Sequence, residues 1–222
     1  MHPIDGRELA RKIRDEVKTE IAKFGLTPGL GVILVGADPA SHLYVALKER
    51  AAREAGIRFE KYLFFSTEPE DKIIKKIQDL NARPDIHAIL VQLPLPEPIS
   101  EDRVIGAIDP TKDVDGFHPE NLKRLHEHAA PVVPGVSLGI MRLIQATGLP
   151  LRGKRAVILA NSTVFAEPLE VLLHEKETNA MSLIRPTQDE ARQWTRDADI
   201  IVIAVGKPGF LNSDMVKDGA VI

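Results

Sequence analysis

The chain has 222 residues, of which 44% are hydrophobic and 27% are charged, the ordinary composition of a globular protein. Its formal net charge of -3 gives no general attraction to nucleic acid or to an anionic membrane surface. The absence of cysteine excludes disulfides, thiolate catalysis and cysteine-bound metals. The sequence carries no signal or transit pattern and no apolar run near the roughly 20 residues that span a bilayer. We therefore predict a cytoplasmic protein with no metal site and no nucleic-acid or membrane partner.

Helices and strands alternate in the first part of the chain. Apolar residues recur every four positions from Leu9 to Ile21, which predicts a helix over residues 7–24. Short apolar or branched runs predict strands at 31–35, 58–65 and 88–91. Further helices are expected at 42–55, with Ser41 as the N-cap, and at 70–81.

The alternation resumes after a strand-poor stretch at residues 105–134. Strands are predicted at 155–159, 181–184 and 200–205, and residues 220–222 resemble the start of another. Helices are predicted at 138–146, 167–175 and 189–196. Strands that alternate with helices at this spacing favour parallel sheets with right-handed crossovers. We expect two α/β domains that meet near residue 136.

Tyr44 and Lys48 lie four residues apart on a predicted helix, so their side chains share one face. A lysine beside a phenol, partly shielded from water, can act as a general acid or base. The same spacing is also common on solvated helices, where it has no chemical role.

Gln92 directly follows a predicted buried strand. Ligands of parallel α/β sheets bind at the carboxyl ends of strands, so Gln92 is placed to face a site. The alternative is an amide that satisfies loop backbone. The prolines of Leu93-Pro94-Leu95-Pro96 restrict the loop that follows.

Asp113 and Asp115 flank Val114, and Gly116 follows them. One carboxylate in such a turn can bind a guanidine-like edge of a ligand through two hydrogen bonds. The alternative is an Asx turn, which Asp-Gly segments adopt readily. The residue pattern by itself leaves both interpretations open.

Three motifs occur together in the first domain. Residues 35–48 read Val-Gly-x-x-Pro-Ala-Ser followed by Tyr-x-x-x-Lys, residues 91–96 read Val-Gln-Leu-Pro-Leu-Pro, and residues 112–116 read Lys-Asp-Val-Asp-Gly. In this order and spacing they resemble the methylenetetrahydrofolate dehydrogenase/cyclohydrolase family of one-carbon metabolism. The resemblance implies a parallel-sheet, folate-binding catalytic domain at 1–136 and an incomplete Rossmann-like nucleotide-binding domain at 137–222.

The resemblance also implies roles for individual residues. Lys48 would be the general acid/base of the cyclohydrolase step, and Gln92 would position it. Tyr44 would stack on the folate, and Asp115 would hydrogen-bond the pterin ring. The substrate site would be completed by Val91, Leu93 and Pro94. The expected activity interconverts methylene-, methenyl- and 10-formyltetrahydrofolate, in a homodimer formed through the second domain.

The nucleotide-binding turn departs from the family's pattern, Gly-x-Ser-x-x-Val-Gly-x-Pro. Residues 160–168 read Ala-Asn-Ser-Thr-Val-Phe-Ala-Glu-Pro, so both glycines are alanine. Each added methyl is either tolerated or blocks the approach of a pyrophosphate. The candidate cofactor residues are Ala160, Asn161, Ser162 and Arg185, the last for the 2′-phosphate of NADP, with NAD as the alternative cofactor. Cyclohydrolase chemistry is therefore better supported than dehydrogenation.

The family pattern continues beyond the position that Ile222 matches, through a loop beside the substrate and a final helix. The sequence is accordingly interpreted as a fragment or as a naturally short product. The alternative function is that of a non-catalytic paralogue that binds folate or serves as a subunit partner.

Overall fold

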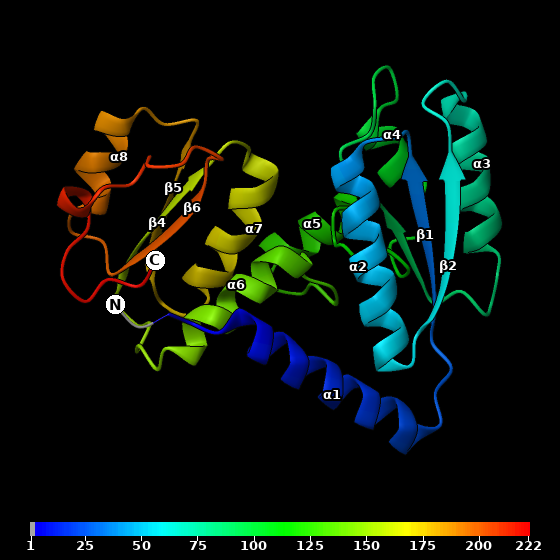
Figure 1. The fold of residues 1–222 in the computed structure, drawn as a ribbon, viewed down its shortest axis with the longest axis horizontal. Coiled ribbons are helices and arrows are strands. Elements are labelled where there is room, and N and C mark those ends of the chain that lie inside the picture. Colours follow the sequence, from blue (N-terminus) through cyan, green and yellow to red (C-terminus); the bar gives the residue numbers. More distant parts are fainter. Residues whose placement is uncertain (1–2) are drawn as a thin grey trace. The chain divides into compact units, whose positions relative to one another are not determined.

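The computed structural model describes residues 3–222 and contains two compact units, one of Asp5–Arg124 and one of Leu125–Ile222, with which residues 3–4 are grouped. Each unit is built on a three-stranded parallel sheet with helices packed on it (Figure 1). The strand orders are β2-β1-β3 and β5-β4-β6. The predicted α/β class with parallel sheets is confirmed, whereas the boundary near residue 136 stays a prediction.

The first unit takes its sheet from three short strands. They are β1 (Gly29–Val35), β2 (Arg58–Phe64) and β3 (Ala88–Val91). The helices of this part of the chain are α1 (Gly6–Phe24), α2 (Pro39–Ala55), α3 (Glu70–Asn81), α4 (Glu101–Ile105) and α5 (Pro119–His126), of which α5 crosses the division between the units.

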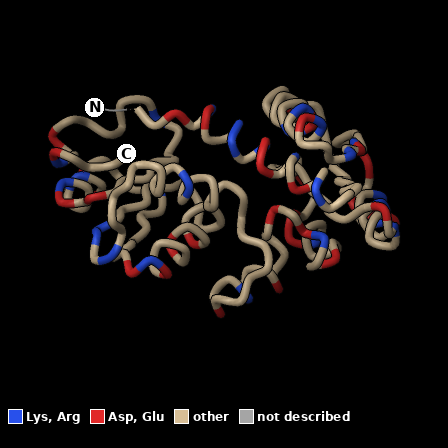
Figure 2. Tube along the Cα trace, turned by 90° about the horizontal axis from the view of Figure 1, so that it is seen from below, with Lys and Arg blue, Asp and Glu red and all other residues tan. Residues whose placement is uncertain are grey.

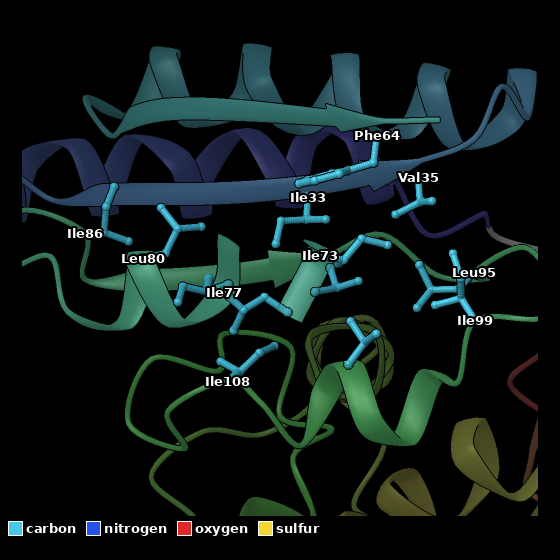
Figure 3. Close-up of a cluster of buried hydrophobic side chains, with 13 residues drawn as sticks. Ile33, Val35, Phe64, Ile73, Ile77, Leu80, Ile86, Leu95, Ile99 and Ile108 are labelled. Carbon is cyan, nitrogen blue, oxygen red and sulfur yellow. The ribbon is translucent and has the colours of Figure 1, made fainter. Parts of the chain in front are cut away.

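The central strand β1 is buried because helices cover both faces of its sheet. Successive side chains of a strand point to opposite faces. Ile33 and Val35 pack in a core with α3, which Figure 3 shows between the sheet and that helix. Val32 and Leu34 pack on the other face, against α2. This two-sided burial accounts for the continuous apolar run of the strand.

The segment after α4 lies beside β3 and brings its polar residues to the carboxyl edge of the sheet. The Ile89 N–H donates a hydrogen bond of 2.7 Å to the carbonyl oxygen of Lys112, and Ile89 forms an isolated parallel bridge with Asp113. Asp115 therefore follows a segment that runs alongside the strand leading to Gln92.

The second unit repeats this plan with β4 (Arg155–Ala160) as the central strand. Its neighbours are β5 (Asn179–Ile184) and β6 (Ile200–Ala204). The remaining elements are α6 (Gly135–Ala146), α7 (Thr163–His174), α8 (Gln188–Thr195) and the short 3-10 helix η1 (Ser213–Met215). Alternate residues of β4 pack in two cores, one with α6 and α7 and one with α8. Val221 forms an isolated parallel bridge with Ile200, where a further strand was expected to start.

Three helix starts differ from the predictions. Helix α6 begins at Gly135 and not at residue 138. The N-cap of α2 is Asp38 and not Ser41, because the Asp38 carboxylate accepts a 2.7 Å hydrogen bond from the Ser41 N–H. Helix α7 begins at Thr163 and continues through Pro168, whereas the sequence placed its start at residue 167. The N-cap is Ser162, so Pro168 lies inside the helix and does not mark its start.

Residues 3–222 show no segregation of charge (Figure 2) and no membrane-spanning helix. Lysines and arginines are interspersed with acidic residues in both units, so neither sign forms a continuous stripe along the chain (Figure 2). No helix in that range is long and apolar enough to cross a membrane. The same residues contain no group of three or more histidine or acidic side chains that could hold a metal ion.

Candidate active site

The side chains of Lys48 and Gln92 meet at the carboxyl edge of the first sheet. Lys48 lies in the middle of α2, and Gln92 directly follows β3. The Lys48 Nζ donates a 3.1 Å hydrogen bond to the Oε1 of Gln92. The Nε2 of Gln92 donates to the carbonyl oxygen of Leu93 at 2.7 Å, which fixes the amide with its oxygen toward the ammonium group. The structure thus unites two predicted residues that are 44 positions apart.

Asp115 lies within electrostatic reach of Lys48 and is half-buried. Burial raises the pKa of the Asp115 carboxyl above its ordinary value, since the charged form loses hydration. The positive charge of Lys48 opposes this rise, and the negative charge of Asp113 adds to it. The site therefore combines a lysine amine, an amide and a carboxyl group whose pKa is raised by burial, the components of proton transfer.

Tyr44 lies one helical turn before Lys48 on α2, as predicted from their spacing. Its side chain is 60% exposed, and the neighbouring Leu43 and Leu47 are exposed to similar extents. An exposed phenol ring beside apolar groups offers a flat surface on which a planar ligand can stack.

The three remaining predicted substrate residues have different environments. Val91 is buried in the core beneath the site, so only its backbone is available to a ligand. Leu93 is half-buried against the same core, and Pro94 is exposed after a cis peptide bond. The loop of residues 92–96 therefore presents the exposed ring of Pro94 at the sheet edge, beside half-buried Gln92, Leu93 and Pro96.

Two residues of the Lys112–Gly116 segment have roles that the sequence did not reveal. The Lys112 Nζ donates to the carbonyl oxygens of Leu80, Asn81 and Arg83 at the end of α3. Asp113 is buried and accepts hydrogen bonds from its own loop. Asp113 forms the Asx-type turn, and Asp115 stands near Lys48, where its binding to a ligand stays a prediction.

The second unit has an open helix start at the carboxyl end of its central strand. Strand β4 ends at Ala160, and α7 starts at Thr163 after Ser162, whose side chain makes no capping hydrogen bond. The N–H groups of the first helical turn lack intrahelical partners and point along the helix axis, which suits an anion such as a pyrophosphate. Asn161 and Ser162 are both exposed beside this helix start.

Both alanines of the altered turn direct their methyl groups into the core. Ala160 is 0% exposed and Ala166 is 1% exposed, and both belong to the cluster between β4 and α7. Neither methyl occupies the surface that a nucleotide would approach. The residues present therefore fit a dinucleotide in spite of the lost glycines.

Arg185 follows β5 and lies next to this helix start. Its backbone N–H donates to the Ala160 carbonyl oxygen at 2.7 Å, and its side-chain Nε donates to the Asn161 carbonyl oxygen at 3.2 Å. Its φ of 51° is left-handed. The guanidinium is exposed and keeps further N–H donors for a phosphate. All four predicted cofactor residues are thus at one edge of the second sheet, with Ala160 buried beneath the other three.

These features together define a class of two-domain α/β enzyme. Proton-transfer groups lie at the edge of one sheet, and a nucleotide cradle, formed by the start of α7 with Asn161, Ser162 and Arg185, lies at the edge of the other. Residues 4–115 match the model of the tetrahydrofolate dehydrogenase/cyclohydrolase catalytic domain, and residues 134–222 match that of the NAD(P)-binding domain of the same family. The chain belongs to the tetrahydrofolate dehydrogenase/cyclohydrolase family, as its three motifs predicted.

Individual relatives agree over almost the whole chain. The bifunctional protein FolD of Methanococcoides burtonii is 41% identical over 99% of this chain and 78% of its own length. The crystal structure of the bifunctional enzyme FolD from Campylobacter jejuni has a TM-score of 0.92 at 37% identity, with 98% of this chain and 78% of that chain covered. The crystal structure of the Trypanosoma brucei enzyme, complexed with NADP and an inhibitor, has a TM-score of 0.94 at 30% identity. The match covers 99% of this chain and 76% of that chain.

Proposed function

We propose that this chain interconverts methylene-, methenyl- and 10-formyltetrahydrofolate, as a methenyltetrahydrofolate cyclohydrolase and an NADP-dependent methylenetetrahydrofolate dehydrogenase. The observation that carries the proposal is the hydrogen bond from Lys48 to Gln92, with Asp115 within electrostatic reach of Lys48. Support also comes from the bifunctional relatives and from the solved dehydrogenase/cyclohydrolase structures.

In the cyclohydrolase step, water adds to the cationic methenyl carbon. Lys48, as the neutral amine, accepts a proton from that water and returns it to N5 as the carbon–N5 bond breaks. The second proton of the water leaves as the formyl group forms on N10, so the reaction releases one proton overall. Gln92 accepts a hydrogen bond from the protonated amine and holds it beside the reacting carbon.

The other predicted residues bind and orient the substrate. Tyr44 offers its ring for stacking, and Asp115 binds the donor edge of the pterin through two hydrogen bonds. The exposed ring of Pro94, the Leu93 side chain and the backbone of Val91 border the same sheet edge.

Replacement of Lys48 by methionine tests the cyclohydrolase assignment. We expect Lys48→Met to slow the decay of methenyltetrahydrofolate absorbance by at least ~100-fold, the usual contribution of a general acid/base. The matched control is Lys75→Met, which removes an exposed lysine that pairs with Asp79 on α3. Parent protein that is folded but no faster than buffer would refute the enzymatic proposal for this chain.

The second domain is proposed to hold NADP. The N–H groups at the start of α7 would bind the pyrophosphate, and Arg185 would bind the 2′-phosphate. A bound nicotinamide would supply the hydride acceptor for the dehydrogenase step. Asn161 stiffens the cradle, because its Nδ2 donates to the Val205 carbonyl oxygen at 3.1 Å and so joins the ends of β4 and β6.

Cofactor preference depends on Arg185 in this proposal. We expect Arg185→Gln to weaken NADP binding by about 10-fold, the loss of one charge-assisted contact, and to leave NAD binding unchanged. Calorimetric titration of both nucleotides measures this, with Arg142→Gln on the exposed side of α6 as the matched control. Equal effects on NADP and NAD would remove Arg185 from the 2′-phosphate site.

A homodimer through the second domain is also proposed. β5 is an edge strand of its sheet, with half-buried Met181 and Leu183 and exposed Ile184, which suits pairing with a second copy. Sedimentation velocity measures the mass of the particle, and a monomer at micromolar concentration would contradict the dimer.

A further inference from the structure

The segment that carries Asp115 is anchored firmly upstream. The carbonyl oxygen of Lys112 accepts the N–H of Ile89, and the Lys112 ammonium donates to three carbonyl oxygens at the end of α3. One residue thus ties the segment both to the central sheet and to a helix. Asp115 stands only three positions farther on.

Downstream of Asp115, the chain is anchored by the carboxylate of Asp113. This side chain is 2% exposed. It accepts hydrogen bonds from the N–H of Gly116 at 3.1 Å, from the N–H of His118 at 2.8 Å and from the Nδ2 of Asn121 at 2.9 Å. Because Gly116 directly follows Asp115, these bonds fix the backbone of the turn that presents the Asp115 carboxyl.

Asn121 is the side chain that holds the Asp113 carboxylate. Asn121 is 0% exposed, and its Nδ2 also donates to the Pro110 carbonyl oxygen at 2.9 Å. Its Oδ1 is buried and has no hydrogen-bond partner among the described residues. An unpartnered buried oxygen reduces stability, so packing alone would favour an apolar side chain here. The amide is explained by the donors that it supplies to Asp113 and to Pro110.

We propose that Asp113 is a positioning residue: clamped by Asn121, it fixes the turn that presents Asp115 to Lys48, and its negative charge acts on the Asp115 carboxyl. The inference deepens the proposed function and rests on it only for what Asp115 does to a folate. The geometric and electrostatic effects on Asp115 exist in the free protein and can be measured without substrate.

The electrostatic part predicts a change in the titration of Asp115. Two charged side chains act on this carboxyl, Lys48 from α2 and Asp113 from its own loop. Of the two, Asp113 raises the pKa of Asp115, so its neutralisation lowers that pKa. We expect Asp113→Asn to move the carboxyl 13C titration midpoint of Asp115 to lower pH. In the pH dependence of kcat/KM, the step that reports Asp115 should move to lower pH as well.

Two further variants separate this role from a loss of structure. Asn121→Ala keeps the Asp113 charge but removes its clamp, so it should raise KM for the folate several-fold without a fall in the Asp115 midpoint. Asp109→Asn is the matched control, because that loop carboxylate accepts hydrogen bonds from Thr111 and is not among the groups that act on Asp115. It should leave the Asp115 midpoint and the folate KM unchanged.

The titration also distinguishes this proposal from the proposed function. If the parent protein lacks turnover but the Asp115 midpoint falls in Asp113→Asn, the function fails and the electrostatic coupling stands. A folded Asp113→Asn protein whose Asp115 titrates as in the parent overturns the positioning role. If Asp113→Asn does not fold, Asn121→Ala decides, and an unchanged folate KM in that variant overturns the role.

Discussion

Gly29 begins the central strand of the first sheet at a place where no side chain fits. A Cβ atom built there would lie 2.1 Å from the carbonyl oxygen of Asp85, which is backbone and cannot move aside easily. The glycine is therefore required by close approach and not by a turn.

Gly29→Ala is expected to destabilise the protein by about 1–3 kcal/mol, the usual cost of overpacking. Urea unfolding followed by circular dichroism measures the change. Gly139→Ala is the control, because nothing lies within 4 Å of its Cβ position inside α6 and alanine favours helices. An unchanged free energy of unfolding for Gly29→Ala would show that the backbone at Asp85 moves aside at no cost, which would contradict the prediction.

The acidic pair shows how far residue patterns could predict this site. Spacing alone placed Tyr44 and Lys48 on one helix face and Gln92 at a strand end, because helical and strand geometry is local. Spacing could not assign separate roles to Asp113 and Asp115. Their difference depends on the amide of Asn121 and on the position of α2, which are contacts between segments distant in sequence.

At the scale of elements, most helices and strands follow from apolar periodicity, while the helix ends do not. Residues 70–81 and 88–91 coincide with α3 and β3 because their apolar stripes end where turn residues begin. Helix α4, just before the strand-poor stretch, and helix α5, within it, were missed, because five- and eight-residue helices give little periodic signal. The N-cap Asp38 was missed because a serine nearby also suits that position.

Helix α3 depends on a residue outside it for the capping of its last carbonyl groups. Its C-cap, Ala82, provides no side-chain group, and the Lys112 ammonium serves instead. Lys112→Met should destabilise the protein by about 1–3 kcal/mol, since part-buried carbonyl groups lose a charged donor. The free energy of unfolding in urea is the measurement, with Lys75→Met as the control at an exposed site on the same helix. Equal stabilities for the two variants would contradict the capping role.

At the scale of the whole molecule, both units contain carboxylates that are ionised more readily than usual. Hydrogen bonds from Arg83 and then from Tyr62 lower the pKa of Glu60 from 4.5 to about 2. In the second unit, the N–H of Arg155 and then Lys217 lower the pKa of Asp199 from 3.8 to about 2. Each unit therefore contains a carboxylate that stays charged in the folded state at pH values where the unfolded chain is protonated.

Because these folded-state pKa values are depressed, the stabilisation is present above the unfolded values and is lost as pH falls toward about 2. We expect the free energy of unfolding to decline below about pH 4.5 and to decline less steeply in Glu60→Gln and in Asp199→Asn. Urea titrations between about pH 6 and about pH 3 test this. Parallel pH dependences in parent and variants would show that the two carboxylates do not contribute.

The buried methyl groups of Ala160 and Ala166 bear on how motifs tolerate change during evolution. A glycine in a nucleotide fingerprint is often taken as indispensable, yet here both replacements face hydrophobic neighbours and fill space. Alanine inside α7 also has a better helix propensity than glycine, by up to about 1 kcal/mol. Selection for stability can thus replace the glycines of a nucleotide-binding motif by alanine, while the surface that a nucleotide would contact stays free of the added methyl groups. A search that demands both glycines would discard sequences of this kind for a reason unrelated to cofactor binding.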